Sequence, residues 1–321
     1  MDPRLPTLAS PTLEAIENAA DRLAGSIVRT PLARLDVDES PAAIWLKLEN
    51  LQPVGSFKVR GAGNAIAELD AKRLAEGVYT ASAGNMAQGL AWAARRHGVR
   101  CTAVVPDHAP RTKLAAIERL GGRVDKVPFD AWWRILETRA YDRAEGHFVH
   151  PVAAPAVIAG NGSIGLEILE DLPDVDTVIA PFGGGGLSTG IAAALRGRGS
   201  DARVLAAEVS TAAPLAAALA HGGPTPVEYT ASFVDGIGGK TVLPEMWPLV
   251  RDLIATSLVV SPQAIAEAIR LLVERHRIVA EGAGAAPVAA ALAGDVGRGK
   301  VVCVVSGGNL DHDELASILA G

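Results

Sequence analysis

Strand-like apolar segments alternate with glycine-rich turns and helices along most of this 321-residue sequence. Three of these segments, 77–81, 177–180 and 300–305, are each followed closely by a turn rich in Gly, Ser or Asn. Short apolar runs that are bounded by such turns and separated by helical segments are typical of parallel strands. The alternation therefore predicts an α/β protein with two open, twisted, mostly parallel sheets flanked by helices.

The chain is long enough for two domains that share one interface. Strands are expected at 43–48, 77–81, 99–105, 123–127, 177–180, 204–208 and 300–305. Helices are expected at 11–24, 62–69, 88–96, 111–120, 131–143, 164–169, from 189 onward, at 261–275 and from 281 onward.

Composition limits the classes of partner and the compartment. Hydrophobic residues make up 49% of the chain and aromatic residues only 4%, so the core is expected to be aliphatic. The formal charge is −6, so the chain lacks the excess of basic residues that would favour binding to nucleic acid or to an anionic membrane. The start of the chain lacks the features of a signal peptide, and no apolar run reaches membrane-spanning length. Cys101 and Cys303 lie inside apolar runs, as small core residues of a reducing compartment do. We therefore expect a soluble cytoplasmic protein.

Lys58 stands in an unusual setting, between Gly55 and Gly61 and next to Phe57. The flanking glycines indicate a turn that opens into a helix. A lysine at a helix start is unfavourable for the helix dipole, so another requirement can have placed it there. Lys58 is either a solvated surface lysine or a desolvated amine that forms a Schiff base with an aldehyde cofactor.

Two loops between a strand and a helix are candidates for anion binding. The run Gly183–Gly186 can direct backbone N–H groups at a phosphate, although some of its glycines could serve only a tight turn. It lacks the Lys-Ser/Thr ending of a Walker loop and the spacing of a dinucleotide fingerprint. The segment Ser82–Gln88 could bind a carboxylate, or Ser82 or Asn85 could act as an ordinary helix cap. Because functional groups of parallel sheets gather at strand carboxyl ends, these loops, Lys58 and the turn 306–309 are expected to converge.

The combined motifs resemble those of the fold-type II pyridoxal-phosphate enzymes, which have a tryptophan synthase β-like fold. The similarity is strongest to the threonine/serine dehydratases (ammonia-lyases), with serine racemases as relatives. It runs from about Thr30 to the C-terminus. The matching motifs occur in the same order, at 53–62, 82–85, 183–187, 279–286 and 306–309.

This resemblance implies the cofactor pyridoxal 5'-phosphate, held by Lys58 as a Schiff base. Lys58 would later act as the base that removes the Cα proton of an amino-acid substrate. Phe57 would pack near the cofactor, Asn85 would hydrogen-bond its 3-hydroxyl, and Ser306 would contact its pyridine nitrogen. Because a hydroxyl cannot hold that nitrogen protonated, prompt β-elimination is favoured.

The remaining site residues implied by the resemblance fall into two sets. Those that bind the phosphate or line the ring are Gly183, Gly184, Gly185, Gly186, Leu187, Gly236 and Glu281. Those that bind the substrate are Ser82, Ala83, Gly84, Asn85, Met86 and Ala87.

The sequence departs from the family pattern near the expected substrate. Met86 stands where dehydratases usually have His, and the segment 150–154, which includes Val152, lacks the Phe-Asp or Asn that follows His-Pro in relatives. Gly160–Ser163 reads Gly-Asn-Gly-Ser in place of Gly-Gln-Gly-Thr. Racemases of the family carry a serine base where Ala83 stands, and alanine cannot move a proton. These positions bear on substrate choice and weigh against racemisation.

No metal site is expected, because a single carboxylate is a poor ligand set for a hard cation. Glu208 is a weak candidate, since Pro214 occupies the place of a second carboxylate found in some relatives. Trp132 and Trp133 are expected to pack a helix against the small domain, with a role at the substrate entrance as the alternative. Surface or capping roles are expected for His97, His108, His147, His221, His276 and His312.

The sequence thus predicts a two-domain enzyme with the cofactor between the domains. Residues 1–71 and 149–321 would form a large domain, and 72–148 a small mobile domain that closes over substrate. The expected reaction is β-elimination of L-threonine, L-serine or an analogue such as 3-hydroxyaspartate to a 2-oxo acid and ammonia. The alternatives are β-replacement, racemisation, and a non-catalytic cofactor-binding protein. A homodimer is the family expectation.

Overall fold

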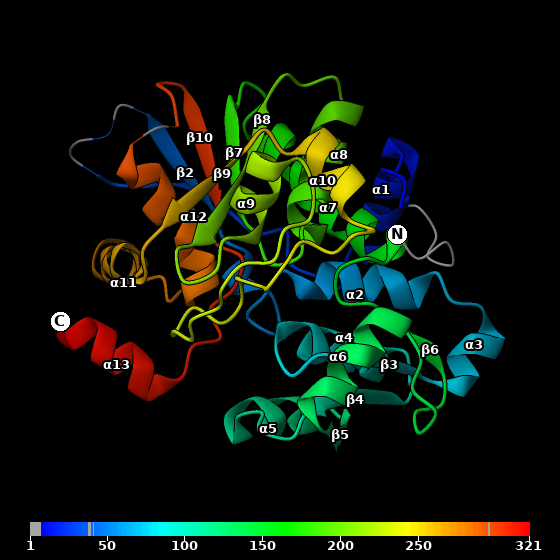
Figure 1. Cartoon of the computed structure of the whole chain (residues 1–321). Helices are drawn as coiled ribbons and strands as arrows, with labels where there is room; N and C mark the ends of the chain where they lie inside the picture. Colours follow the sequence, from blue (N-terminus) through cyan, green and yellow to red (C-terminus); the bar gives the residue numbers. More distant parts are fainter. Residues whose placement is uncertain (1–7, 38–39, 41, 295) are drawn as a thin grey trace.

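A six-stranded sheet and a four-stranded sheet lie in the upper and lower parts of the molecule as drawn in Figure 1. The computed structural model describes residues 8–37, 40, 42–294 and 296–321. The α/β class and the two mostly parallel sheets predicted from the alternation of segments are confirmed.

The six-stranded sheet has the order β1-β2-β10-β7-β8-β9. Only β1 and β2 pair antiparallel, and the other neighbours are parallel. Its strands are β1 (Leu32–Arg34), β2 (Ala43–Lys47), β7 (Thr177–Pro181), β8 (Arg203–Val209), β9 (Thr256–Val260) and β10 (Lys300–Val304). The central strands β7 and β10 are almost wholly buried, as strands covered on both faces must be.

The four-stranded sheet has the order β5-β4-β3-β6 and is parallel throughout. Its strands are β3 (Val78–Ala81), β4 (Cys101–Pro106), β5 (Arg123–Val127) and β6 (His147–Phe148). All four come from the segment predicted as a small domain, whose boundaries remain a prediction.

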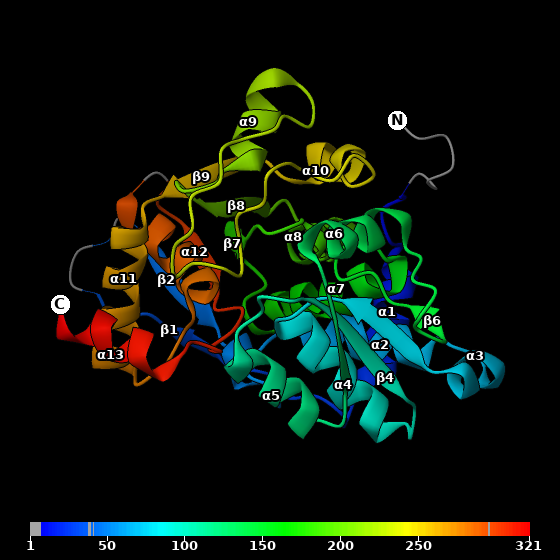
Figure 2. The same cartoon turned by 60° about the horizontal axis from the view of Figure 1, so that its bottom comes forward.

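Helix α2 (Lys58–Ala67) lies between the two sheets, because it packs against α7 on one side and α4 on the other. Figure 2, turned by 60°, shows α2 above α4 and beside α1. The remaining helices are α1 (Leu13–Leu23), α3 (Ala71–Glu76), α4 (Asn85–Arg96), α5 (Arg111–Arg119), α6 (Phe129–Thr138), α7 (Pro155–Asp171), α8 (Gly186–Gly197), α9 (Pro214–His221), α10 (Trp247–Leu253), α11 (Pro262–Leu271), α12 (Gly282–Ala293) and α13 (His312–Ala320).

Several element boundaries differ from the sequence prediction. The helix expected at 164–169 is the 17-residue α7, and the helix expected at 131–143 ends early because Arg139 adopts φ 59°. The helix expected at 261–275 is α11 followed by a π-helical turn at Leu272–His276. The short or edge elements β1, β9, α3, α9, α10 and α13 were not predicted.

A buried network of charges fastens α2 to the larger sheet. The Arg60 guanidinium donates to Glu49 at 2.7 Å and to Glu167 at 2.7 Å, and Lys47 Nζ reaches Glu167 at 2.5 Å. The Lys47, Glu49 and Arg60 side chains are fully buried. Burial acts to raise the pKa of Glu49, but the ionic contacts with Arg60 outweigh it and lower that pKa. The charges are therefore retained because each has a partner.

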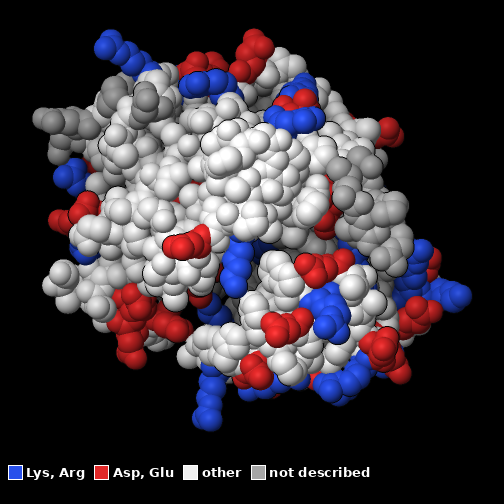
Figure 3. Space-filling view, viewed as in Figure 1, with Lys and Arg blue, Asp and Glu red and all other residues white. Residues whose placement is uncertain are grey.

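Both cysteines lie in the apolar interior. Cys101 on β4 and Cys303 on β10 are free and buried, and burial raises the pKa of both thiols. Within the described residues, no helix has the length and apolar character needed to span a bilayer. Figure 3 shows acidic and basic side chains scattered together over one face, rather than gathered by sign.

We predict that Arg60→Met lowers the free energy of unfolding by about 3–5 kcal/mol, because Glu49 would keep a buried charge without its ionic partner and Glu167 would keep only Lys47. Urea denaturation followed by circular dichroism measures this change. The matched control is Arg73→Met, which removes an exposed arginine 3.9 Å from Asp70 and is expected to cost less than about 1 kcal/mol. Equal losses for the two variants would contradict the prediction.

Candidate functional site

A cavity of about 1180 Å³ opens at the carboxyl ends of strands from both sheets. The predicted loops converge on it, as expected for open parallel sheets. The predicted residues that line this cavity are Phe57, Lys58, Ser82, Ala83, Gly84, Asn85, Met86, Gly183, Gly184, Gly185, Gly186, Leu187, Gly236, Glu281 and Ser306. Ala87, on α4, does not line the cavity, because its side chain faces the apolar core against which α4 packs.

Lys58 occupies the first position of α2, and its side chain lies in the cavity. The preceding turn needs Gly55, whose φ is 69°. Lys58 Nζ donates to the Pro151 carbonyl at 2.9 Å and lies 5.0 Å from the centre of the Phe57 ring. Burial lowers the pKa of Lys58 to about 8, against an opposing effect of Glu281. The neutral, nucleophilic fraction of the amine near neutral pH is therefore much larger than that of an ordinary lysine.

Glu281 and two asparagines form a hydrogen-bonded chain beside Lys58. The Asn85 amide donates to Glu281 Oε1 at 2.7 Å, and the Asn309 amide donates to Asn85 Oδ1 at 2.8 Å. Burial raises the pKa of Glu281 to about 7, the charge of Asp235 adds to this, and the Asn85 hydrogen bond opposes it. Because Asn309 also donates to the Val54 carbonyl at 2.8 Å, it fixes which way the Asn85 amide faces. Asn309 was part of a sequence motif but was not predicted as a site residue.

The glycine loop forms the start of α8. Gly185 caps that helix with φ 95°, a conformation that favours glycine. A Cβ on Gly184 would come within 2.7 Å of the Val152 side chain. Within the described residues, the N–H groups of Gly183, Gly184 and Gly185 donate to no acceptor. Free N–H groups at a helix N-terminus are an anion-binding arrangement.

The loop before α4 is open to the cavity. Gly84 occupies the N-cap position of α4, and no side chain caps the helix, so the interpretation of Ser82 or Asn85 as the cap is wrong. The Gly84 N–H instead contacts Ser82 Oγ at 3.3 Å. Met86 is 2% exposed and lies among the apolar side chains of the smaller sheet.

Other residues of the cavity were not predicted as site residues, except that a role at the substrate entrance was the alternative given for Trp132. Trp132 and Phe129 of α6 line it with their rings 5.7 Å apart, and no described residue accepts a hydrogen bond from the buried Trp132 Nε1. Lys113 of α5 pairs with Asp235 across the cavity. His108 and His312, expected on the surface or at caps, also line the cavity. Only the topology brings these residues together, since no local motif marks them.

Glu208, the candidate metal ligand, caps a helix. Its carboxylate accepts the N–H groups of Leu215 and Ala216, both at 2.8 Å, at the start of α9. It also accepts the Ser257 hydroxyl at 2.6 Å. Within the described residues, no group of three or more acidic, His or Cys side chains could hold a metal.

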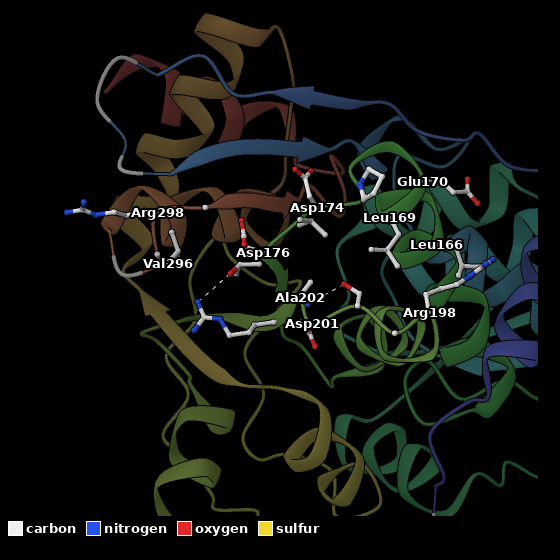
Figure 4. A pocket seen from close by; sticks show the side chains of 18 residues that line it. Leu166, Leu169, Glu170, Asp174, Asp176, Arg198, Asp201, Ala202, Val296 and Arg298 are labelled. Carbon is white, nitrogen blue, oxygen red and sulfur yellow. Dashed lines mark hydrogen bonds between the residues drawn. The ribbon is translucent and has the colours of Figure 1, made fainter.

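A second cavity, of about 950 Å³, lies at the opposite edge of the larger sheet, where β7, β8 and β10 begin (Figure 4). Several of its charged side chains are engaged with protein groups. Asp174 pairs with Lys300, Asp176 accepts the Lys300 N–H at 2.7 Å, and Arg198 pairs with Glu17 at 2.8 Å. None of the predicted site residues lines it, so the candidate site is the first cavity.

The comparisons with known proteins agree with this geometry. Residues 23–307 match the family model described as "Pyridoxal-phosphate dependent enzyme", and the chain belongs to that family. The fold-type II class predicted from the motifs is thereby confirmed.

Within this family, the chain is similar to ammonia-lyases, deaminases and racemases of amino acids. The chain is 40% identical over 313 residues to the L-threonine ammonia-lyase of Thermotoga maritima, and the match covers 96% of this chain and 78% of that protein. The solved structure of maize serine racemase superposes with a TM-score of 0.89 at 31% identity, covering 97% of this chain and 98% of that one. The processed form of threonine deaminase isoform 2 from Solanum lycopersicum superposes with a TM-score of 0.85 at 28% identity, covering 99% of this chain and 97% of that one.

The residues present fit pyridoxal phosphate. The unpartnered N–H groups of Gly183–Gly185 suit its phosphate, and the Lys58 amine, with a pKa of about 8, suits its aldehyde. Asn85 and Ser306 line the same cavity with hydrogen-bonding side chains. Bound there, the cofactor would supply an electron sink for negative charge that develops at the substrate Cα.

We predict that Glu281→Gln lowers the pKa of Lys58 further below its ordinary value. The negative charge of Glu281 favours the protonated amine, so its removal makes the amine neutral at a lower pH. The pH dependence of Lys58 acylation in the cofactor-free protein, measured by peptide mass spectrometry, reports this shift. Glu314→Gln is the control, because Glu314 lines the same cavity but takes no part in the Lys58 shift. An unchanged midpoint in Glu281→Gln would contradict the assignment.

We also predict that Gly184→Ala weakens cofactor binding, because the added methyl group meets Val152 and displaces the loop. Overpacking of this kind costs about 1–3 kcal/mol, which corresponds to roughly five- to 150-fold in the dissociation constant. Equilibrium titration with pyridoxal phosphate measures it. Val152→Ala in the same chain should restore part of the affinity. Gly223→Ala, where the added methyl group meets nothing within 4 Å, should have no effect.

Proposed function

We propose that the protein is a pyridoxal-phosphate-dependent ammonia-lyase. Its reaction is β-elimination of a β-hydroxy-α-amino acid, such as L-threonine or L-serine, to a 2-oxo acid and ammonia. The observation that carries the proposal is the convergence of the Lys58 amine, the glycine loop and the open loop 82–86 on one cavity. The identity of 40% to an L-threonine ammonia-lyase supports the reaction class.

We assign different parts of the cofactor to different residues of the cavity. Gly183–Leu187 would hold the cofactor phosphate, Phe57 and Gly236 would pack beside the ring, and Ser306 would face the ring nitrogen. A carboxylate at that nitrogen would keep it protonated, whereas a hydroxyl does not. Charge at Cα would then be drawn less fully into the ring, and this would favour prompt loss of the β-hydroxyl.

Lys58 has two roles in this proposal. Its amine would attach the cofactor, and after release it would take the Cα proton at Nζ. A pKa of about 8 suits both roles, because the amine can be neutral to accept a proton and protonated to return one. Glu281, held by Asn85, would orient the ring and the amine rather than react.

Substrate binding is proposed at the loop before α4. Ser82, Gly84 and Asn85 would hold the substrate carboxylate near the start of that helix, where the dipole favours an anion. Residues 72–148 would form the mobile small domain, and the Lys113–Asp235 pair would join its α5 to the other side of the cavity.

We also propose a homodimer located in the cytoplasm. Light scattering of the purified protein tests the dimer.

Racemisation is the second candidate, because the structure superposes on serine racemase with a TM-score of 0.89. Ala83 lines the cavity but carries no group that moves a proton. A single base on one face of Cα does not suffice for the two-base proton exchange expected of a racemase. Elimination is therefore preferred.

The test is turnover of L-threonine, L-serine and 3-hydroxyaspartate by the parent protein and by Lys58→Ala. We expect 2-oxo acid from at least one substrate, no D-amino acid, and a visible absorption band that is absent in Lys58→Ala. The loss of the nucleophile is expected to lower turnover by at least about 1000-fold. A D-amino acid without 2-oxo acid would favour racemisation, and a new amino acid formed after adding a thiol would favour β-replacement. An absorption band that no amino acid changes would favour a non-catalytic protein.

A further inference from the structure

His150 lies behind the cavity, two residues after the end of β6. Its side chain is 2% exposed, and its Nδ1 lies 3.1 Å from the Val152 N–H and 2.8 Å from the Ala153 N–H. His150 does not line the cavity, whereas its neighbours Pro151 and Val152 do. It can therefore act on the reacting groups only through the chain that follows it.

The turn that follows His150 carries the hydrogen-bond partner of Lys58. The Pro151 carbonyl accepts from Lys58 Nζ at 2.9 Å. The proline ring fixes φ at Pro151, and the two N–H groups after it are both held by the His150 ring. With its flanking groups held in this way, the carbonyl has one orientation, toward the amine.

This arrangement requires one form of the histidine. An Nδ1 that accepts hydrogen bonds carries no proton, so a neutral ring must carry its proton on Nε2. Burial and the nearby charges of Arg139 and Lys58 lower the pKa of His150 to about 3, so the ring remains neutral over the working range of pH.

We propose that His150 is a positioning residue for Lys58: its Nδ1 holds the turn 151–153 so that the Pro151 carbonyl aims the Lys58 amine. The contact acts whenever that amine is free, which includes the step in which Lys58 moves the Cα proton. The proposal rests on the proposed function for the role of Lys58, but the contact itself can be tested without turnover.

Two substitutions distinguish the role of Nδ1 from that of the rest of the His150 side chain. In His150→Asn, Oδ1 is attached to Cγ as Nδ1 is, and can accept the same two N–H groups. In His150→Gln, the polar atoms lie one bond further out, near the position of Nε2, and the turn loses its acceptor. The two variants have similar size and polarity, so a role in packing alone would affect them alike.

The first measurement is the pKa of Lys58, from the pH dependence of its acylation in the full-length protein without cofactor. The Pro151 carbonyl stabilises the charged amine. If the carbonyl turns away and this hydrogen bond is lost, the pKa of Lys58 falls below about 8. We expect this shift in His150→Gln and not in His150→Asn. Identical midpoints in the two variants would overturn the proposal.

The second measurement is turnover by the protein loaded with cofactor. We expect kcat to fall about 100-fold in His150→Gln with a smaller change in KM, since a misplaced base slows the chemical step and His150 does not touch the cavity. His150→Asn should lose much less. An equal loss of kcat in both variants would overturn the positioning role.

A third measurement needs no folded variant. Nitrogen-15 NMR of the parent protein, with histidine labelled, reports which ring nitrogen carries the proton. We expect His150 to be neutral, with the proton on Nε2, throughout the range in which the protein stays folded. A proton on Nδ1, or titration near the ordinary pKa of histidine, would overturn the proposal even if His150→Gln failed to fold. If the parent turned over no substrate, the proposed function would fail while the NMR and acylation results still decided this proposal.

Discussion

The pairing of buried charges around Arg60 holds the helix that carries Lys58 in place. Arg60 follows Lys58 by two positions on α2, so the ion pairs that fix Arg60 to Glu49 and Glu167 also fix the start of the helix. Glu49 follows β2, and Glu167 lies on α7, which also packs against α8 behind the glycine loop. Lys58 and the glycine loop Gly183–Gly186 are therefore both held by one rigid framework. An apolar core could pack α2 as tightly, but it would not specify its rotation and register as directional ion pairs can.

Much of the fold followed from the sequence because strands buried on both faces have a clear pattern. β7 and β10 are uninterrupted apolar runs with a turn soon after them, and both were predicted. Edge strands such as β9, which mixes exposed and buried residues, have no such pattern. Helix α7 was predicted too short, and the part that was missed contains Gly160 and Gly162, although glycine is a poor helix former. In the structure Gly160 and Gly165 instead allow close packing, since a Cβ on either would meet the backbone of α2 or the side chains of α8 within 3 Å.

The candidate site was predicted in part for the same physical reason. Loops that follow buried strands carry recognisable residues, and parallel topology places those loops at one edge. Asn309 and His150 act through contacts with residues distant in sequence, so only the folded chain shows what they do. The pKa values of the titratable groups in the site also depend on folding. Burial moves the pKa of Lys58 down to about 8 and that of Glu281 up to about 7, which brings a base and an acid close together in proton affinity. No local sequence pattern contains that information.

The position of β10 has a consequence for how the chain is made. This strand, residues 300–304, lies between β2 and β7 in the larger sheet, although those strands are synthesised long before it. Until β10 emerges from the ribosome, the apolar edges of β2 and β7 have no partner there, and unpaired edges are prone to join other chains. The four-stranded sheet, by contrast, comes from the continuous segment 78–148 and can pair as soon as that segment is complete. During synthesis the larger sheet, whose strand β7 leads into the glycine loop, is therefore expected to become stable last and to depend most on chaperones.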